Sequence, residues 1–140
     1  MKIRETFENR KKNGQKALVT YIVSGDYGYE TTKENIRAMV KAGADVIISG
    51  AGLPMDLPKL VSEESGTKIA PIVSSRRAAN LILKMWAHRY DRTADFIVIE
   101  GPKAGGHLGF SREQLADINA LDFDEEICRI IECKKEYEEK

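Results

Sequence analysis

Residues 68–75 read Lys-Ile-Ala-Pro-Ile-Val-Ser-Ser and contain the pattern that decides the fold. A short and almost continuous apolar run is typical of a strand buried on both faces of a sheet. The two serines that follow are favourable helix N-caps, and a helical pattern then continues to about Arg89. This stretch therefore predicts a strand, a short turn and a helix, which together make one βα unit.

Three further apolar runs resemble this one, at Ala17–Val23, Asp45–Ile48 and Asp95–Ile99. Each run is followed by small or turn-forming residues and then by a helical pattern. The helix expected over Glu30–Ala42 has Gly43 just past its end, where a left-handed conformation is needed. Strands that alternate with helices pair in parallel through right-handed crossovers. The sequence thus predicts an α/β fold of four βα units, half of a TIM (β/α)8 barrel.

Both ends of the chain add a helical pattern to these units. An extra helix is expected over Ile3–Asn13, and another from Asp122 onward. Ser111 lies close to a Glu113-Gln114 pair, a combination that predicts a capped helix start. Because there is no linker or low-complexity tract, residues 1–140 are expected to form a single half-barrel domain.

Composition excludes several functional classes. The 140 residues hold 22 Lys plus Arg and 22 Asp plus Glu, so the net charge is zero, which argues against nucleic-acid or anionic-membrane binding. No apolar run approaches a membrane span, and the N-terminus lacks the apolar region of a signal peptide. Cys128 and Cys133 lie five apart on an expected helix and therefore point in different directions, which predicts reduced thiols, no metal site and a cytoplasmic location.

The strand count also predicts self-association. Four parallel strands leave two open edges, each with unpaired backbone N–H and C=O groups. A closed barrel removes such edges, whereas a half barrel must cover them with helices or pair them with another chain. We therefore expect a homodimer formed through the open sheet edges.

The loop with the richest chemistry is Glu100–Phe110, which reads Glu-Gly-Pro-Lys-Ala-Gly-Gly-His-Leu-Gly-Phe. It follows the last expected strand, at the barrel face where active sites are found. Its glycines permit close approach of a flat ligand, and His107 has the chemistry of a general base near neutral pH. The alternative interpretation is a turn-forming loop with a surface histidine.

Weaker candidates follow the two preceding strands. Gly50 and Gly52 are suited to a wall against which a ring can lie, although Gly-x-Gly alone has low specificity. Ser74 can hydrogen-bond a ligand, but an N-cap explains one serine of the Ser74-Ser75 pair without any ligand. Trp86 and His88, late in the same helix, are interpreted as packing residues and partners of the helix dipole.

Three ordered blocks, 42–54, 68–75 and 95–110, make the chain from about residue 42 onward resemble flavin-dependent nitronate monooxygenases, formerly called 2-nitropropane dioxygenases. The resemblance implies that Ala104, Gly105 and Gly106 line FMN. It also implies that His107 takes a proton from the carbon next to a nitro group, after which the alkyl nitronate is oxidised with O2 as electron acceptor. Gly50, Gly52 and Ser74, which follow the two preceding strands, are further cofactor-binding candidates from their own chemistry.

Residues 1–45 resemble a different family, the tryptophan synthase α subunit. The similarity lies in Lys16–Ile22, Gly25-Asp26 and Glu30-Thr31-Thr32, and the two resemblances meet at Ala42–Asp45. A chimera of two barrel fragments and a truncated natural paralogue both account for this arrangement. Ile48 stands where the α subunit has a catalytic glutamate, which argues against tryptophan synthase chemistry.

The nitronate monooxygenase resemblance is also incomplete. The family's first strand brings a Gly-Gly-Met-Gly loop to the flavin, and this sequence has none. Barrel phosphate sites are commonly built after strands seven and eight, which this chain does not contain. The sequence therefore leaves two functions open: an FMN-dependent nitronate oxidoreductase that is incomplete as a monomer, and a half-barrel scaffold or assembly module without activity.

Overall fold

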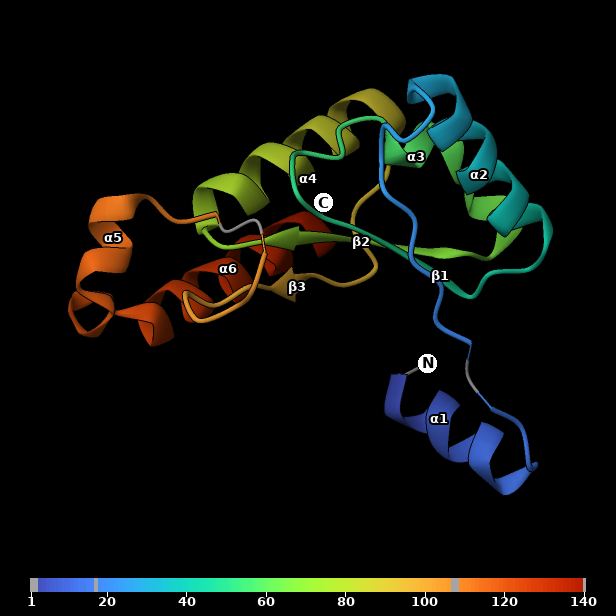
Figure 1. Cartoon of the computed structure of the whole chain (residues 1–140), viewed down its shortest axis with the longest axis horizontal. Helices are drawn as coiled ribbons and strands as arrows, with labels where there is room; N and C mark the ends of the chain where they lie inside the picture. The colour runs from blue at the N-terminus through green and yellow to red at the C-terminus, as the bar shows by residue number, and fades with distance from the viewer. Residues whose placement is uncertain (1–2, 17, 107–108, 140) are drawn as a thin grey trace. The chain divides into compact units, whose positions relative to one another are not determined.

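The computed structural model describes residues 3–16, 18–106 and 109–139. The chain divides into two compact units, residues 1–32 and residues 33–140. The first unit contains helix α1 (Ile3–Lys12) and the start of α2 (Tyr29–Lys41), and the second contains the remaining elements (Figure 1). In the parts of the chain that are described, no helix is long and apolar enough to cross a bilayer.

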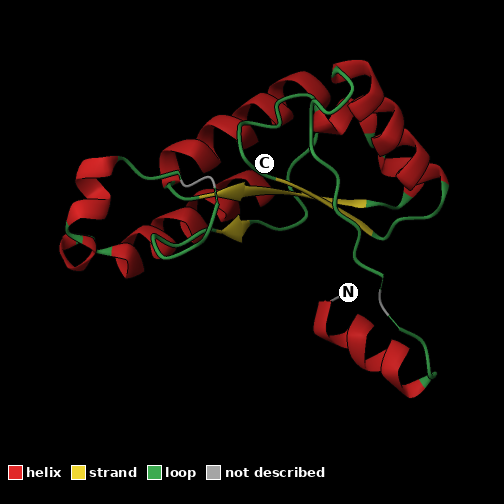
Figure 2. Cartoon of the chain, viewed as in Figure 1, coloured by secondary structure: helices red, strands yellow, loops and turns green. Residues whose placement is uncertain are grey.

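The strand expected over Ala17–Val23 is not formed. Ala17 lies outside the described residues, and Leu18–Val23 have no strand structure (green loop before α2 in Figure 2). Leu18, Val19 and Tyr21 are 86–88% exposed although their residue types favour strands. A strand needs a hydrogen-bonded neighbour as well as suitable side chains, and this segment is not part of the sheet.

The second unit is built on a three-stranded parallel sheet in the order β1-β2-β3. The strands are β1 (Val46–Ser49), β2 (Lys68–Val73) and β3 (Val98–Ile99), so three of the expected strands are present and the third is shorter than expected. Ile47 pairs with Ile69 in register, and Ile72 pairs with Val98. The α/β class and the parallel pairing are confirmed, with three strands in place of four.

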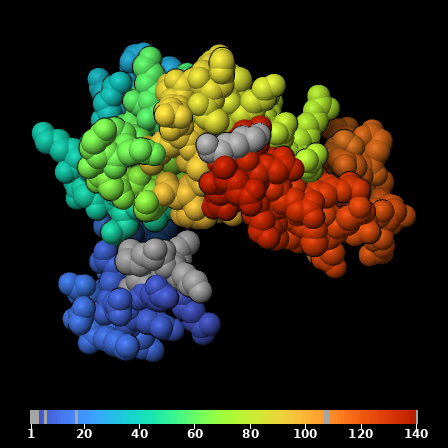
Figure 3. All heavy atoms as spheres, turned by 180° about the vertical axis from the view of Figure 1, so that it is seen from behind, coloured from blue at the N-terminus to red at the C-terminus, as the bar shows by residue number. Residues whose placement is uncertain are grey.

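Each strand is followed by helical structure, as the sequence predicted. Helix α3 (Leu57–Leu60) and the 3-10 helix η1 (Glu63–Ser65) lie between β1 and β2, and α4 (Arg76–Tyr90) follows β2. After β3 come α5 (Arg112–Ala116), η2 (Ile118–Ala120) and α6 (Phe123–Glu138). In Figure 3 the red atoms of α6 adjoin the yellow-green to yellow atoms of the α4 region.

The expected helix boundaries follow from local chemistry. The Ser75 hydroxyl accepts a hydrogen bond from the backbone N–H of Ala78, which confirms this serine as an N-cap. Ser111 and Gln114 form the expected reciprocal capping box. Gly43 has a positive φ of 82°, as predicted for the residue just after α2.

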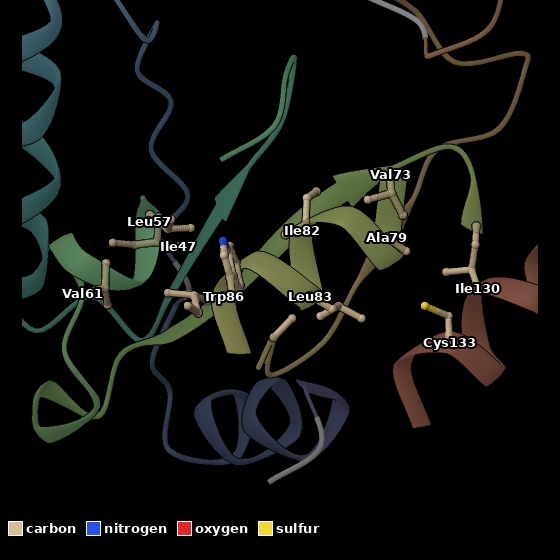
Figure 4. Close-up of a cluster of buried hydrophobic side chains, with 12 residues drawn as sticks. Ile47, Leu57, Val61, Val73, Ala79, Ile82, Leu83, Trp86, Ile130 and Cys133 are labelled. Atoms are coloured by element: carbon tan, nitrogen blue, oxygen red, sulfur yellow. The ribbon is translucent and has the colours of Figure 1, made fainter. Parts of the chain in front are cut away.

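The hydrophobic core lies between the sheet and helices α4 and α6 (Figure 4). Ile69 and Val73 of β2 meet Ile82, Leu83 and Trp86 of α4, with Ile130 and Cys133 of α6 alongside. Side chains alternate along a strand, so Val46 and Ile48, on either side of the buried Ile47, point to the other face. They are 37% and 51% exposed, which leaves this face of β1 open.

Arg92 organises the other end of the sheet, where the strands begin. Its side chain is only 7% exposed, and its guanidinium donates to the backbone carbonyls of Val61 and Thr67. It also lies 3.6 Å from the carboxylate of Asp95, which pairs with Lys68 at 2.9 Å. Asp95 in turn accepts a hydrogen bond from the backbone N–H of Ile69 at 2.9 Å, so this network ties β2 to the segment that leads into β3.

We expect Asp95 to give the protein an acid-sensitive contribution to stability. Burial alone would raise the pKa of Asp95, but the hydrogen bond from Ile69 and the cations Lys68 and Arg92 outweigh it and lower the pKa. Because the folded pKa lies below the unfolded value of about 3.9, the contribution is complete above pH ~4 and is lost as pH falls through the folded pKa. Asp95→Asn should therefore cost about 1–2 kcal/mol at pH 7, and this cost should shrink as pH falls below about 4.

Urea unfolding at pH 7 and at pH 2–3 measures this difference. Asp91→Asn is the matched control, because Asp91 is an exposed left-handed residue of the same loop, where asparagine is well tolerated. A stability gap between Asp95→Asn and the native chain that stays constant down to pH 2 would contradict the assignment.

Candidate functional site

The candidate site lies at the carboxyl ends of the three strands. The strands end at Ser49, Val73 and Ile99, and because they are parallel the loops that follow them leave from the same edge of the sheet. The ends of β2 and β3 and the segment that leads from β3 to α5 can be followed in Figure 1. The described cofactor-binding candidates are all in these loops or directly after a strand: Gly50, Gly52, Ser74, Ala104, Gly105 and Gly106.

Gly50 is required for packing. A Cβ atom at this position would lie 2.5 Å from Cδ1 of Ile72 on the neighbouring strand. The sequence presented Gly50 as a wall for a ligand ring; the structure adds a close internal neighbour, and the ligand role stays a prediction. Gly52 has a positive φ of 149° and open space around the position of its Cβ, so it remains exposed and accessible.

The loop after β1 is fastened to helix α4. The indole Nε1–H of Trp86 donates to the carbonyl of Pro54 at 2.9 Å, and the hydroxyl of Tyr90 donates to the carboxylate of Asp56 at 2.6 Å. The hydrogen bond to Asp56 raises the pKa of Tyr90, with Arg89 opposing the shift. Trp86 is fully buried, so its interpretation as a packing residue is confirmed, and it also holds Pro54 beside the candidate site.

Ser74, Glu100 and Gly109 meet at the ends of β2 and β3. Ser74 is 8% exposed, and its hydroxyl donates to Oε2 of Glu100 at 3.2 Å. The backbone N–H of Gly109 donates to the same oxygen at 3.4 Å. Ser74 thus lies at the glycine-rich loop, where its hydroxyl is engaged by a side chain of the protein, and its role in cofactor binding stays a prediction.

Ala104, Gly105 and Gly106 form the exposed part of the loop after β3. Gly106 has a positive φ of 85°, and the positions of a Cβ at Gly105 and Gly106 have no neighbouring atom within 4 Å. A flat ligand therefore has free access to this backbone. His107, the predicted catalytic base, lies outside the described residues, so its role stays a prediction.

Glu100 is the functional candidate that the sequence reasoning missed. A carboxylate directly after a strand at this face is the sequence signal that could have found it. What could not be seen from the sequence is its partner, because Ser74 is 26 residues away along the chain.

The structure also contains a cavity at the opposite end of the strands. It has a volume of about 320 Å3 and is lined by polar residues that include Thr67, Lys68, Arg92, Thr93 and Asp95. None of the predicted site residues lines it. Within the described residues there is no group of three or more His, Cys, Asp or Glu side chains placed to hold a metal ion.

Comparison with known proteins gives a family match and several partial relatives. The family model for nitronate monooxygenase matches residues 2–128. The tryptophan synthase alpha chain of Caldanaerobacter subterraneus subsp. tengcongensis is 43% identical over 49 residues, and that of Geotalea daltonii is 49% identical over 49 residues. Each match covers 35% of this chain and 19% of the relative, so the chain corresponds to about a fifth of these proteins.

A solved structure, that of a FabK mutant from Thermotoga maritima, is also similar. It is 19% identical with a TM-score of 0.46, and the match covers 74% of this chain and 36% of FabK.

Proposed function

The chain belongs to the nitronate monooxygenase family, and we propose on this premise that it binds FMN and oxidises alkyl nitronates and nitroalkanes with O2. The family is FMN-dependent in general. The observation that carries the proposal is the loop after β3, which leaves the carboxyl end of the sheet with Ala104, Gly105 and Gly106 exposed and uncovered.

The residues present fit the flat part of a flavin better than its phosphate. Exposed glycine backbone at 105 and 106 leaves room for a ring to lie against it. The N-terminus of α4, a natural place for a phosphate, is already occupied, because the backbone N–H of Arg76 donates to the carboxylate of Glu126 at 2.6 Å. The Arg76 side chain is paired with Glu136 at 3.2 Å.

In the proposed reaction the loop residues bind and orient, and His107 moves a proton. Ala104, Gly105 and Gly106 line the ring, with Gly50, Gly52 and Ser74 at the neighbouring strand ends. His107 takes the proton from the carbon next to the nitro group of a nitroalkane. FMN, when bound, would supply a two-electron acceptor for the nitronate, with O2 as the final oxidant. Because Glu126 engages the N-terminus of α4, we expect a partner half barrel to supply the phosphate clamp.

The alternative function is a scaffold or assembly module without catalysis. Two observations favour it: the side chains of Leu18, Val19 and Tyr21 are largely exposed, and β1 is an edge strand with an open apolar face at Val46 and Ile48. In this reading the chain is half of a barrel that forms a homodimer through its sheet edges. Neither Cys128 nor Cys133 forms a disulfide, which suits a cytoplasmic location in either case.

We expect purified protein to quench FMN fluorescence in a saturable, stoichiometric titration. Gly105→Val should weaken FMN binding about tenfold or more, because the new side chain fills the open space where the ring would lie. The backbone conformation of Gly105 is one that valine can also adopt, so the loop itself should not be strained. Lys84→Val, on the exposed face of α4, is the control and should leave the affinity unchanged.

Light scattering on the same sample separates the two functions. A dimer that binds FMN supports the shared half-site, whereas a dimer that never binds FMN favours the assembly module. A colourless chain whose FMN signal does not saturate at millimolar concentration would contradict the flavin proposal.

A further inference from the structure

We propose that Glu100 is the positioning residue of the candidate site, holding the two ends of the loop of residues 101–109 together above Ser74. The consequence for catalysis rests on the proposed function, because it concerns where the loop presents its glycines and His107. The positioning itself rests only on contacts among described residues.

One carboxylate oxygen of Glu100 accepts two hydrogen bonds. Oε2 of Glu100 accepts from the hydroxyl of Ser74 at 3.2 Å and from the backbone N–H of Gly109 at 3.4 Å. Glu100 is itself fixed by its own backbone N–H, which donates to the carbonyl of Val73 at 2.9 Å. The start of the loop, its end and the end of β2 therefore meet at one side chain. Both distances are long for hydrogen bonds, so the two contacts act together rather than as single strong bonds.

The lack of a side chain at Gly109 makes this meeting sterically feasible. A Cβ there would lie 2.5 Å from Oγ of Ser74 and 2.9 Å from its Cβ. Both are closer than real side-chain contacts, so any other residue at this position would push the end of the loop away from Ser74. The absence of a side chain at Gly109 thus allows its backbone N–H to reach Glu100. The contacts of Glu100 with Ser74 and Gly109 are called the clamp below.

A second contact, of a different kind, holds the segment just after the clamp. The rings of Phe110 and Phe123 stack edge to face with centroids 6.0 Å apart, and a Cβ at Gly101 would lie 3.4 Å from the ring of Phe123. The loop therefore rests on α6 through apolar contact and is closed by Glu100 through polar contact. Removing Glu100 should open the loop and leave the apolar contact and the core in place.

Trypsin cleavage after Lys103 tests the clamp directly, because Lys103 is an exposed residue inside the loop. When opening and closing are fast, the cleavage rate follows the population of the open form. Loss of two hydrogen bonds to a charged group should raise that population about tenfold or more. Glu100→Ala is expected to show this acceleration, and Glu100→Gln, which keeps an acceptor oxygen, a smaller one. Glu132→Ala, at an exposed glutamate of α6, is the control.

Cleavage after Lys84, inside α4, is the internal reference for global unfolding. A further variant tests the geometry independently: Gly109→Ala should accelerate cleavage after Lys103, because the new methyl group would lie 2.5 Å from Oγ of Ser74. Equal cleavage rates after Lys103 in the native chain, Glu100→Ala and Gly109→Ala would overturn the proposal, as would an acceleration that appears equally after Lys84.

An FMN titration of the same variants separates this inference from the proposed function. If the native chain binds FMN, Glu100→Ala should weaken binding while Glu132→Ala does not. If the native chain binds no FMN but cleavage after Lys103 still depends on Glu100, the clamp stands and the proposed function fails. If FMN binds and Glu100→Ala changes neither affinity nor cleavage, the clamp fails and the proposed function stands.

Discussion

Trp86→Ala is expected to destabilise the second unit by about 3–5 kcal/mol, the range for truncating a fully buried aromatic side chain. The indole has no exposed surface and lies at the centre of the core, among side chains from β2, α3 and α4. Its truncation leaves a cavity that the surrounding strands and helices cannot fill. Since small domains have only about 5–15 kcal/mol of total stability, the variant should lose a large share of it. Urea unfolding followed by circular dichroism measures the change.

Two milder variants divide the effect into packing and hydrogen bonding. Trp86→Phe keeps most of the buried area but removes the Nε1–H that donates to the carbonyl of Pro54 at 2.9 Å, so about 1–2 kcal/mol should be lost. Trp86→Leu should fall between the two and remains measurable if the alanine variant does not fold. A loss below about 1 kcal/mol in Trp86→Leu would mean that the packing of this residue has been assigned wrongly.

His107→Ala is expected to slow nitroalkane oxidation about 10²–10⁴-fold, the usual contribution of a general base. The prediction follows from the proposed function. A neutral nitroalkane must lose a proton before its carbon can be oxidised, whereas a preformed nitronate has already lost it. The same substitution should therefore reduce nitronate oxidation much less. Oxygen consumption with the two substrates, at matched flavin occupancy, measures the ratio.

His88 supplies a matched control, since it is the only other histidine of the chain and is exposed in the last turn of α4. His88→Ala should leave both oxidation rates unchanged. Equal nitroalkane rates in His107→Ala and the native chain would remove His107 from the mechanism, and equal losses with both substrates would assign it to binding.

The strands show which part of the fold could be predicted from local sequence. The runs at 45–48, 68–73 and 95–99 contain strands, because helices follow each of them and cover one face of the sheet. The run at 17–23 has the same composition but is not a strand in its described part. The composition of a segment indicates whether it is able to form a strand. Whether the strand forms depends on a neighbouring strand, which is often distant in the sequence.

The candidate site shows the same limit. The helix caps could be predicted from the sequence because they depend on residues only three positions apart. The Ser75 N-cap and the Ser111–Gln114 capping box are both confirmed. The contact of Gly50 with Ile72 and that of Ser74 with Glu100 join different strands, so no local pattern reveals them. As a result, neither the neighbour of Gly50 nor the partner of Glu100 could be predicted from the sequence.

The burial of Trp86 also has an optical consequence. It is the only tryptophan of the chain, and its indole is fully enclosed and hydrogen-bonded to the loop that follows β1. Its ultraviolet emission therefore comes from one defined environment and overlaps the absorption of an oxidised isoalloxazine. The protein thus contains an intrinsic energy-transfer donor, and occupancy of a nearby ring site can be followed as donor quenching without attaching a label.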